Sequence, residues 1–294
     1  MSRQQTPGTR QKPQEKRKKK AGKGRFFAIA AALAVLLGGV LWWHFRTPST
    51  IQFRDHVLEV KKDVPKSHYL PENFRVDDGG RVTYDHLGIK ARFGVDVSYY
   101  QENVDWEAAV QDGVEFAIVR AGFRGYESGV VQEDVRFEEN MRGAQDAGLP
   151  VGVYFFSQAT TPEEAEEEAE FVLDLLDGRE LQYPVVFDWE TIGRGKPART
   201  DLMTGEEITD CAQAFCARIR KGGYEPMVYF NPELGYLGYD LSRLKGIPFW
   251  LARYESLPDF YYDYDLWQYS HTGTVDGIKG RVDMILDMKP EMRG

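Results

Sequence analysis

Cysteine and histidine are scarce in this chain, whose 294 residues include two cysteines and five histidines. Cys211 and Cys216 both lie in the segment 208–219, where apolar side chains recur at helical spacing on one face. Side chains five positions apart on a helix point in different directions, which argues against a disulfide and predicts two buried thiols. The histidines at positions 44, 56, 68, 86 and 271 form no ligand-spaced set, so the sequence predicts no metal site.

Phosphate-binding motifs are also missing from the sequence. It contains no G-x-x-x-x-G-K-S/T run and no G-x-G-x-x-G after an apolar strand, the patterns that surround phosphates with backbone amides. A nucleotide-dependent function therefore has no support. We expect a reaction that needs no cofactor.

Positive charge is concentrated at the start of the chain, since the segment 1–25 carries a net charge of +9 and the segment 26–294 carries −18. The basic run at 16–20 is of a kind that can neutralise nucleic-acid phosphates. However, the segment 26–43 follows directly and contains no charged side chain. As a helix it would span roughly 27 Å, enough to cross a bilayer core. We therefore expect a transmembrane helix at 26–43 and no contact with nucleic acid.

The charges flanking this apolar run predict its orientation. Lys and Arg crowd its N-terminal side, so residues 1–25 are expected to be a cytoplasmic tail and the body to lie outside the cell. Trp42 and Trp43 stand where an interfacial aromatic belt belongs, and no small-residue cleavage site follows. The sequence thus predicts a retained single-pass anchor in the cell membrane.

Residues 44–91 are rich in charged residues and turn formers. We interpret them as a short extracellular stalk, with a hairpin formed by residues 74–76 and 81–84 around an Asp-Asp-Gly-Gly turn.

From residue 93 onward, short apolar segments alternate with amphipathic helical patterns, which is typical of parallel β/α units. Strands are expected near residues 93–98, 115–121, 151–157, 185–189, 227–230, 249–254, 266–269 and 282–285, and helices at 133–147 and 162–176. About eight apolar strands in this length predict a barrel closed on itself, spanning residues 92–290.

The helix expected at 162–176 has a clear start signal, with Thr161 as N-cap and Pro162 in the first turn. The acidic run at 163–170 is then interpreted as a solvated face of this helix.

The segment PVVFDWE at 184–190 is an apolar strand that ends in two acids. Strand side chains alternate between faces, so Asp188 and Glu190 should point the same way, into the mouth of the barrel. Two neighbouring carboxylates in a partly desolvated site repel each other, which raises the pKa of one of them. A glycoside hydrolase needs such a pair, one carboxyl to protonate the leaving oxygen and one carboxylate to act on the sugar.

Two further acids end apolar segments: Asp96 in FGVDVS (93–98) and Asp283 in RVDM (281–284). Together with VFDWE (186–190) and WQYS (267–270), these segments resemble the glycoside hydrolase family 25 muramidases. Residues 119–122, 152–157 and 248–254 also look like the framework of that family. The resemblance covers roughly residues 93–288.

The resemblance implies an enzyme that cleaves the β-1,4 bond between N-acetylmuramic acid and N-acetylglucosamine in peptidoglycan glycan strands. It implies an irregular, TIM-like eight-stranded β/α barrel with fewer helices than strands. By position, Glu190 matches the general acid, and Asp188 matches the acid that stabilises developing charge or orients the acetamido group of the substrate. Asp96 and Asp283 match two supporting acids.

Aromatic residues near strand ends are candidates for stacking on sugar rings. Tyr154 and Trp250 are the better candidates, Tyr229 and Trp267 are further ones, and Arg120 in the family-like segment 119–122 is a candidate substrate contact.

Two other interpretations remain open. A chitinase-like barrel also ends a strand in a D-W-E type motif, but usually carries another Asp where this chain has Val186. A non-catalytic peptidoglycan-binding protein would keep the barrel without turnover. Asp276 competes with Asp283 for the fourth acidic position, and the sequence does not specify an oligomeric state.

Overall fold

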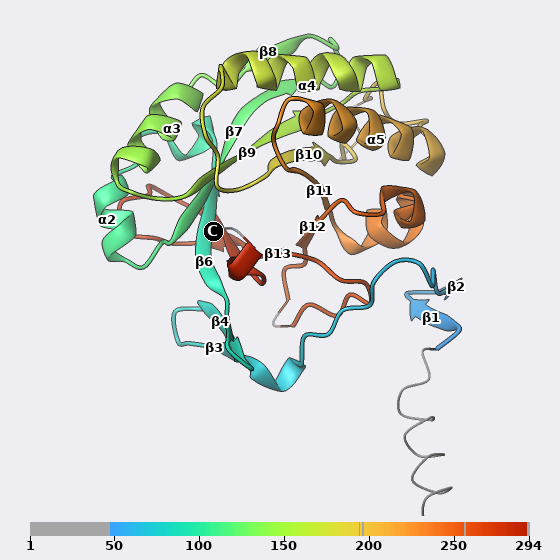
Figure 1. The fold of residues 1–294 in the computed structure, drawn as a ribbon, viewed down its shortest axis with the longest axis horizontal. Helices are drawn as coiled ribbons and strands as arrows, with labels where there is room; N and C mark the ends of the chain where they lie inside the picture. Colours follow the sequence, from blue (N-terminus) through green and yellow to red (C-terminus); the bar gives the residue numbers. More distant parts are fainter. Residues whose placement is uncertain (1–47, 194, 196, 256, 293–294) are drawn as a thin grey trace, which may run out of the picture. The chain divides into compact units, whose positions relative to one another are not determined.

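The computed structural model describes residues 48–193, 195, 197–255 and 257–292 (Figure 1). The expected cytoplasmic tail and transmembrane helix, and residues 44–47 of the expected stalk, lie outside the described residues. Within the described part of the chain, no helix has both the length and the apolar character needed to cross a membrane.

Eight strands close into a barrel, in the order β6, β7, β9, β10, β11, β12, β13 and β14, with β14 paired to β6. The strands are β6 (Arg92–Val97), β7 (Phe116–Arg124), β9 (Val151–Ser157), β10 (Val185–Trp189), β11 (Pro226–Phe230), β12 (Phe249–Ala252), β13 (Leu266–Gly273) and β14 (Val282–Asp287). A short strand, β8 (Val131–Glu133), adds to β7. The predicted eight-stranded closed barrel is confirmed.

The last strand departs from the expected parallel arrangement, because β14 runs antiparallel to both β13 and β6. Only residues 274–281 connect β13 to β14, too few for the crossover that a parallel pair requires. The prediction of parallel units is therefore wrong for β14. Its reversal has a functional consequence, since the start of β14 lies at the same end of the barrel as the last residues of the parallel strands. Asp283 is paired in register with Asp96.

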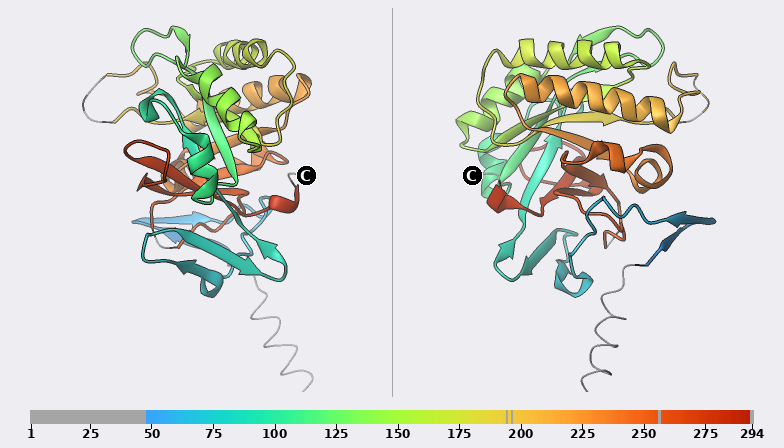
Figure 2. Two further views of the ribbon diagram at one scale, coloured as in Figure 1. Left: turned by 90° about the vertical axis from the view of Figure 1, so that its left-hand side faces the viewer. Right: turned by 45° about the vertical axis from the view of Figure 1, so that its right-hand side comes forward.

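Four α-helices accompany the barrel in the described part of the chain: α2 (Trp106–Gln111), α3 (Phe137–Asp146), α4 (Pro162–Leu176) and α5 (Gly205–Lys221). In Figures 1 and 2, α3, α4 and α5 cover the outside of the barrel around β7, β9 and β10. Only a π-helical turn, η3 (Leu234–Gly238), and a 3-10 turn, η4 (Leu241–Leu244), separate β11 from β12. The described residues therefore form fewer helices than strands, as the resemblance implied.

Helix α4 begins as predicted, with the Thr161 hydroxyl accepting a hydrogen bond from the backbone N–H of Glu164. The interpretation of its acidic run as a solvated face is wrong for Glu168, which is fully buried. Glu168 faces the barrel, and the guanidinium of Arg124 on β7 donates to its carboxylate at 2.7 Å. A buried cation therefore explains a buried acid that the charge pattern alone could not separate from its exposed neighbours.

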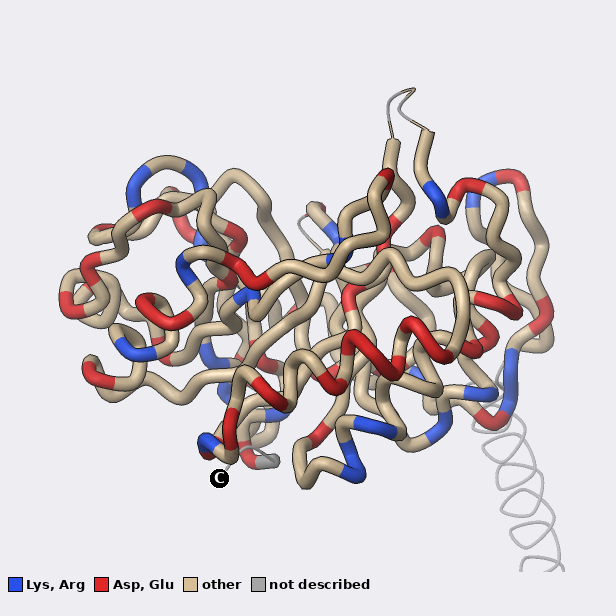
Figure 3. The backbone as a smooth tube through the Cα atoms, turned by 90° about the horizontal axis from the view of Figure 1, so that it is seen from above, with Lys and Arg blue, Asp and Glu red and all other residues tan. Residues whose placement is uncertain are grey.

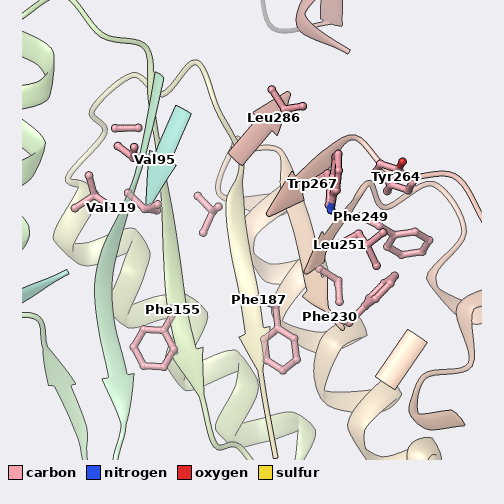
Figure 4. Close-up of a cluster of buried hydrophobic side chains, with 14 of the residues drawn as sticks. Val95, Val119, Phe155, Phe187, Phe230, Phe249, Leu251, Tyr264, Trp267 and Leu286 are labelled. Atoms are coloured by element: carbon pink, nitrogen blue, oxygen red, sulfur yellow. The ribbon is translucent and has the colours of Figure 1, made fainter. Parts of the chain in front are cut away.

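Side chains alternate between the inside and the outside of the barrel. The outward-facing set includes Phe155, Phe187 and Phe230, which Figure 4 shows beside the helices. The ring of Phe187 packs against Phe215 of α5, with centroids 5.2 Å apart. Glycine is required at position 94, because a Cβ there would overlap the Phe116 ring. The inward-facing side chains that fill the barrel interior include Phe116, Ile118, Tyr183, Val186, Met227, Leu266 and Ile285. The interior is therefore closely packed, except at the end that carries the acids.

Residues 48–91 form two small sheets. One is the hairpin of β1 (Thr50–Phe53) and β2 (His56–Glu59), and the other contains β3 (Phe74–Val76), β4 (Val82–His86) and β5 (Ile89–Lys90). The predicted hairpin around the Asp-Asp-Gly-Gly turn is confirmed by the pairing of β3 with β4.

The second half of this segment is packed onto the barrel. The Tyr69 hydroxyl donates to the backbone oxygen of Tyr264 at 2.9 Å, and the Phe74 ring lies edge-on to Trp267, with centroids 5.3 Å apart. These contacts cover the outside of β13, away from helices α3, α4 and α5. Single aromatic residues, Tyr69 and Phe74, thus attach a charged segment to the barrel. The charged composition of the segment did not indicate this packing.

Phe74→Ala should reduce the free energy of unfolding by about 3 kcal/mol, because a buried aromatic contact with the barrel is lost. Urea-induced unfolding measures this value. Val76→Ala on the same strand is the control, since Val76 is 52% exposed. Equal stability of the two variants would show that the contact between Phe74 and Trp267 does not contribute to the barrel's stability.

Candidate active site

A cavity of about 730 Å³ opens at the end of the barrel where the parallel strands finish. Asp96, Asp188, Glu190 and Asp283 all line it. Asp96 and Asp188 are near the ends of β6 and β10, Glu190 follows β10, and Asp283 is near the start of the antiparallel β14. The structure therefore brings together all four predicted acids, from three separate strands. Asp276, the competing acid, is exposed and outside this cavity.

Asp188 and Glu190 both point into the cavity, as strand alternation predicts. Asp188 is buried, and its Oδ1 has no hydrogen-bond partner among the described residues. Glu190 is partly exposed. A buried carboxylate oxygen without a protein partner is free to interact with a bound molecule.

Asp96 is held by an amide whose orientation is fixed. Gln268 Nε2 donates to Asp96 Oδ2 at 2.7 Å. The hydroxyls of Tyr229 and Tyr254 donate to Gln268 Oε1 at 3.0 and 2.7 Å. Because an amide oxygen only accepts and an amide nitrogen only donates, the two tyrosines turn the NH2 group of Gln268 toward Asp96.

Arg120 supplies positive charge within the lining of the cavity. Its Nε donates to Asp134 Oδ2 at 2.6 Å, and its guanidinium lies 4.9 Å from the ring centroid of Tyr99 and 5.4 Å from that of Tyr100. Asp134 also accepts from the backbone N–H of Tyr99. The guanidinium is thereby fixed between an ion-pair partner and two aromatic rings that line the same cavity.

Burial raises the pKa of every one of the four acids, because a carboxylate loses its water shell. The pKa of Glu190 rises to about 7 through burial and then through the charge of Asp283. The pKa of Asp283 rises to about 6 through burial. Burial, followed by repulsion from Glu190, raises the pKa of Asp188 well above its ordinary range, and burial followed by Asp283 does the same for Asp96. The cluster therefore retains protons near neutral pH.

The prediction placed the proton on Glu190 and the charge on Asp188. In the structure, burial favours protonation of both, so desolvation alone does not make this assignment. Arg120 opposes the rise in the pKa of Asp188 and of Asp96. Glu190 has burial and a second acid as the causes of its shift. Among the causes that act on Asp188, Arg120 is the one that favours the negative charge, and it is outweighed by burial and the neighbouring acids.

Four of the five predicted substrate contacts line the cavity: Tyr154, Trp250, Tyr229 and Arg120. Trp250 packs edge-on to both tyrosine rings, with centroids 6.3 Å from Tyr154 and 5.1 Å from Tyr229. These three aromatic residues form one wall of the cavity.

Trp267 does not reach the cavity. Trp267 precedes Gln268 on β13, and neighbouring side chains on a strand point to opposite faces. Because Gln268 faces the cavity, Trp267 faces outward, where its Nε1 donates to the backbone oxygen of Arg253 at 2.9 Å. Its ring packs against Phe74. The expected sugar contact of Trp267 is thus contradicted by the alternation of the strand.

Several lining residues were not identified as site residues from the sequence, namely Tyr99, Tyr100, Tyr254 and Gln268. The signal for Gln268 was available, since it shares the inward face of β13 with Leu266. Tyr99 and Tyr100 follow closely after the strand that carries Asp96. Among the described residues, no group of three or more His, Cys, Asp or Glu is arranged to hold a metal ion.

Comparison with known proteins shows what this chain is similar to. The sequence model of the family described as "Glycosyl hydrolases family 25" matches residues 95–278. The autolytic lysozyme of Clostridium acetobutylicum is 28% identical over 193 residues, which cover 65% of this chain and 54% of the relative. Lysozyme M1 of Streptomyces globisporus is 28% identical over 242 residues, covering 76% of this chain and 78% of the relative.

A solved structure, that of the modular autolysin LytC from Streptococcus pneumoniae, superposes with a TM-score of 0.60 at 21% identity, covering 82% of this chain and 58% of that chain. The present chain thus spans about half the length of the clostridial relative and a little more of LytC. At this identity the superposition supports the fold.

Asp283→Asn should lower the pKa of Glu190 from about 7, because the charge of Asp283 is one of the two causes of its rise. The pKa should remain above the ordinary value, since burial persists. Carboxyl-carbon NMR titration of the folded protein measures the shift. Asp276→Asn provides the control, as Asp276 is exposed. An unchanged Glu190 pKa in Asp283→Asn would show that the two carboxyls do not interact.

Proposed function

The chain belongs to glycosyl hydrolases family 25, and we propose that it is a muramidase that hydrolyses the β-1,4 bond between N-acetylmuramic acid and N-acetylglucosamine in peptidoglycan. The observation that carries this proposal is the gathering of four acids in one cavity of the barrel, with the pKa of Glu190 raised to about 7. The lysozyme names of the relatives from Clostridium acetobutylicum and Streptomyces globisporus support the same reaction.

Glu190 acts as the general acid. Its raised pKa keeps a proton on the carboxyl near neutral pH, and this proton passes to the glycosidic oxygen as the bond to the anomeric carbon breaks. The leaving sugar departs with a hydroxyl group. Water then adds to the anomeric carbon and returns a proton to the Glu190 carboxylate, which restores the enzyme.

Asp188 acts on the positive charge that develops on the sugar. Its unpartnered Oδ1 is available to stabilise that charge or to orient the acetamido group of the substrate. Arg120 favours the ionised form of Asp188. Asp283 raises the pKa of Glu190. Asp96 is paired in register with Asp283 between β6 and β14, and Gln268 holds its carboxyl by a hydrogen bond.

The aromatic wall provides the sugar contacts. Tyr154, Tyr229 and Trp250 present ring faces and edges within the cavity, and such rings pack against the apolar faces of sugars. Hydrogen-bonding groups nearby, including Arg120, would fix the polar substituents of the glycan.

The proposed setting is the outer side of the cell membrane, with residues 26–43 as a single-pass anchor, residues 1–25 in the cytoplasm, and a role in cell-wall remodelling. The uncharged run at 26–43 and the basic segment before it support the anchor. Acidic residues outnumber basic ones in the rest of the chain, as the red and blue segments of Figure 3 illustrate.

Glu190→Gln should reduce the release of reducing ends from purified peptidoglycan by about 10³-fold, because the amide cannot donate a proton to the leaving oxygen. Glu166→Gln on the exposed side of α4 is the matched control and should keep wild-type activity. Equal release by wild type and Glu190→Gln would remove Glu190 from this role. Chitin oligomers serve as a parallel substrate, and a preference for them would favour a chitinase-like specificity. No release by the wild type from either substrate would contradict the proposed hydrolase.

Deletion of residues 26–43 should move the protein from the membrane fraction to the soluble fraction of the host cell, because the proposed anchor is lost. Substitution of the same segment by an equally long run of alternating Leu and Ala should retain it in the membrane. Ultracentrifugation and immunoblotting measure the distribution. Unchanged partitioning after the deletion would contradict the anchor.

A further inference from the structure

Gln158 lies beside the backbone of Glu190, where the pairing of β9 with β10 ends. The last residues in register are Ser157 and Trp189. Glu190 follows Trp189 directly, and Gln158 follows Ser157. The side chain of Gln158 donates from Nε2 to the backbone oxygen of Glu190 at 2.9 Å. A side-chain amide therefore links the two segments one residue beyond the last register pair of the strands.

Three contacts fix the orientation of this amide. Besides Glu190, Nε2 donates to the backbone oxygen of Ser157 at 2.9 Å, and Oε1 accepts from the Thr200 hydroxyl at 2.7 Å. Gln158 is fully buried. Rotating the amide by half a turn would place oxygen against two carbonyl oxygens and nitrogen against the hydroxyl, so only one orientation satisfies the donors and acceptors.

Helix α4 contributes a buried acid, Glu168, next to the same region. Burial raises the pKa of Glu168 to about 7, while the Ser157 hydroxyl, Arg124 and the backbone N–H of Gln158 act in the opposite direction. Arg124 donates to Glu168 at 2.7 Å. The buried ion pair of Arg124 with Glu168 therefore lies next to the backbone that carries Gln158.

The loop after Glu190 is attached through the same residue. Arg199 Nη1 donates to the backbone oxygen of Gln158 at 3.3 Å, and Arg199 Nη2 pairs with Glu164 of α4 at 2.6 Å. Thr200 is 4% exposed and lies next to Arg199. Two residues of the segment between Glu190 and α5, Arg199 and Thr200, therefore form hydrogen bonds with Gln158.

We propose that Gln158, oriented by Thr200, is a positioning residue that holds the backbone of Glu190 so that its carboxyl stays in the cavity beside Asp188 and Asp283. This inference rests on the proposed role of Glu190 as the general acid. Gln158 acts through the backbone and transfers no proton itself. Misplacement of a reacting group by about 1 Å costs on the order of 10²-fold in rate. Loss of the hydrogen bond from Gln158 to the Glu190 backbone should therefore lower the reaction rate measurably.

The expected signature lies in turnover and in pH dependence. Gln158→Met keeps the length of the side chain and removes both the donor and the acceptor. It should lower kcat about 10- to 100-fold with KM changed less than about 2-fold, because the acid is displaced while the sugar contacts remain. A Glu190 carboxyl that spends time nearer solvent also has a lower pKa, so the alkaline limb of the kcat profile should move to lower pH.

A matched pair of threonine variants separates positioning from general loss of stability. Thr200→Val removes the hydroxyl that orients Gln158. Thr209→Val makes the same change at another buried threonine, whose hydroxyl donates to the Gly205 oxygen at 2.6 Å and accepts from the Asp240 N–H at 2.9 Å in and beside α5. We expect a roughly 3- to 10-fold loss of kcat and a shifted alkaline limb for Thr200→Val. Thr209→Val should lower the melting temperature with neither change.

The experiment compares wild type, Gln158→Met, Thr200→Val, Thr209→Val and Glu190→Gln on purified peptidoglycan, with kcat, KM, the pH profile and the melting temperature of each. Wild-type kcat and an unshifted alkaline limb in Gln158→Met would overturn the inference while leaving the muramidase proposal intact. Equal losses in Thr200→Val and Thr209→Val would also overturn it, since the effect would be one of stability. Absence of activity in the wild type, or equal activity in Glu190→Gln, would instead contradict the proposed function.

Discussion

Four carboxyl groups share one cavity with the guanidinium of Arg120, and much of the barrel's construction serves to hold them there. Burial and mutual repulsion raise the pKa values of these acids, so the cluster retains protons at a pH where isolated carboxyls are ionised. Such a cluster is costly to fold. The packed interior below it, the ion pair of Arg120 with Asp134 and the tyrosine-oriented Gln268 keep these groups close together despite that cost.

The direction of the last strand determines the composition of this cluster. Asp96 and Asp188 reach the cavity from the ends of parallel strands, but Asp283 reaches it from the start of a strand that runs the other way. A barrel of eight parallel strands would have placed an acid at the second residue of its last strand at the far end. The short connection between β13 and β14 thus gives the site its fourth carboxyl.

Local patterns in the sequence predicted much of this arrangement. Alternation along 184–190 placed Asp188 and Glu190 on one face, and apolar runs located the eight strands, with β9 and β10 at the predicted residues. What failed depended on partners distant in the chain. Glu168 is distinguished from its acidic neighbours by Arg124, and Trp267 faces outward to meet Phe74, which belongs to the segment before the barrel. The packing of Tyr69 and Phe74 onto the barrel depends on the same kind of contact, as does the link between Gln158 and Glu190.

The pH dependence of kcat/KM on purified peptidoglycan tests the central claim most directly, because it reports the protonation of the free enzyme. We expect a bell-shaped profile. Activity should fall at high pH as Glu190 loses its proton near pH 7, and it should fall at low pH as the other carboxylates that line the cavity become protonated. A flat profile from pH 4 to 8 would contradict a mechanism based on coupled carboxyls in this cavity.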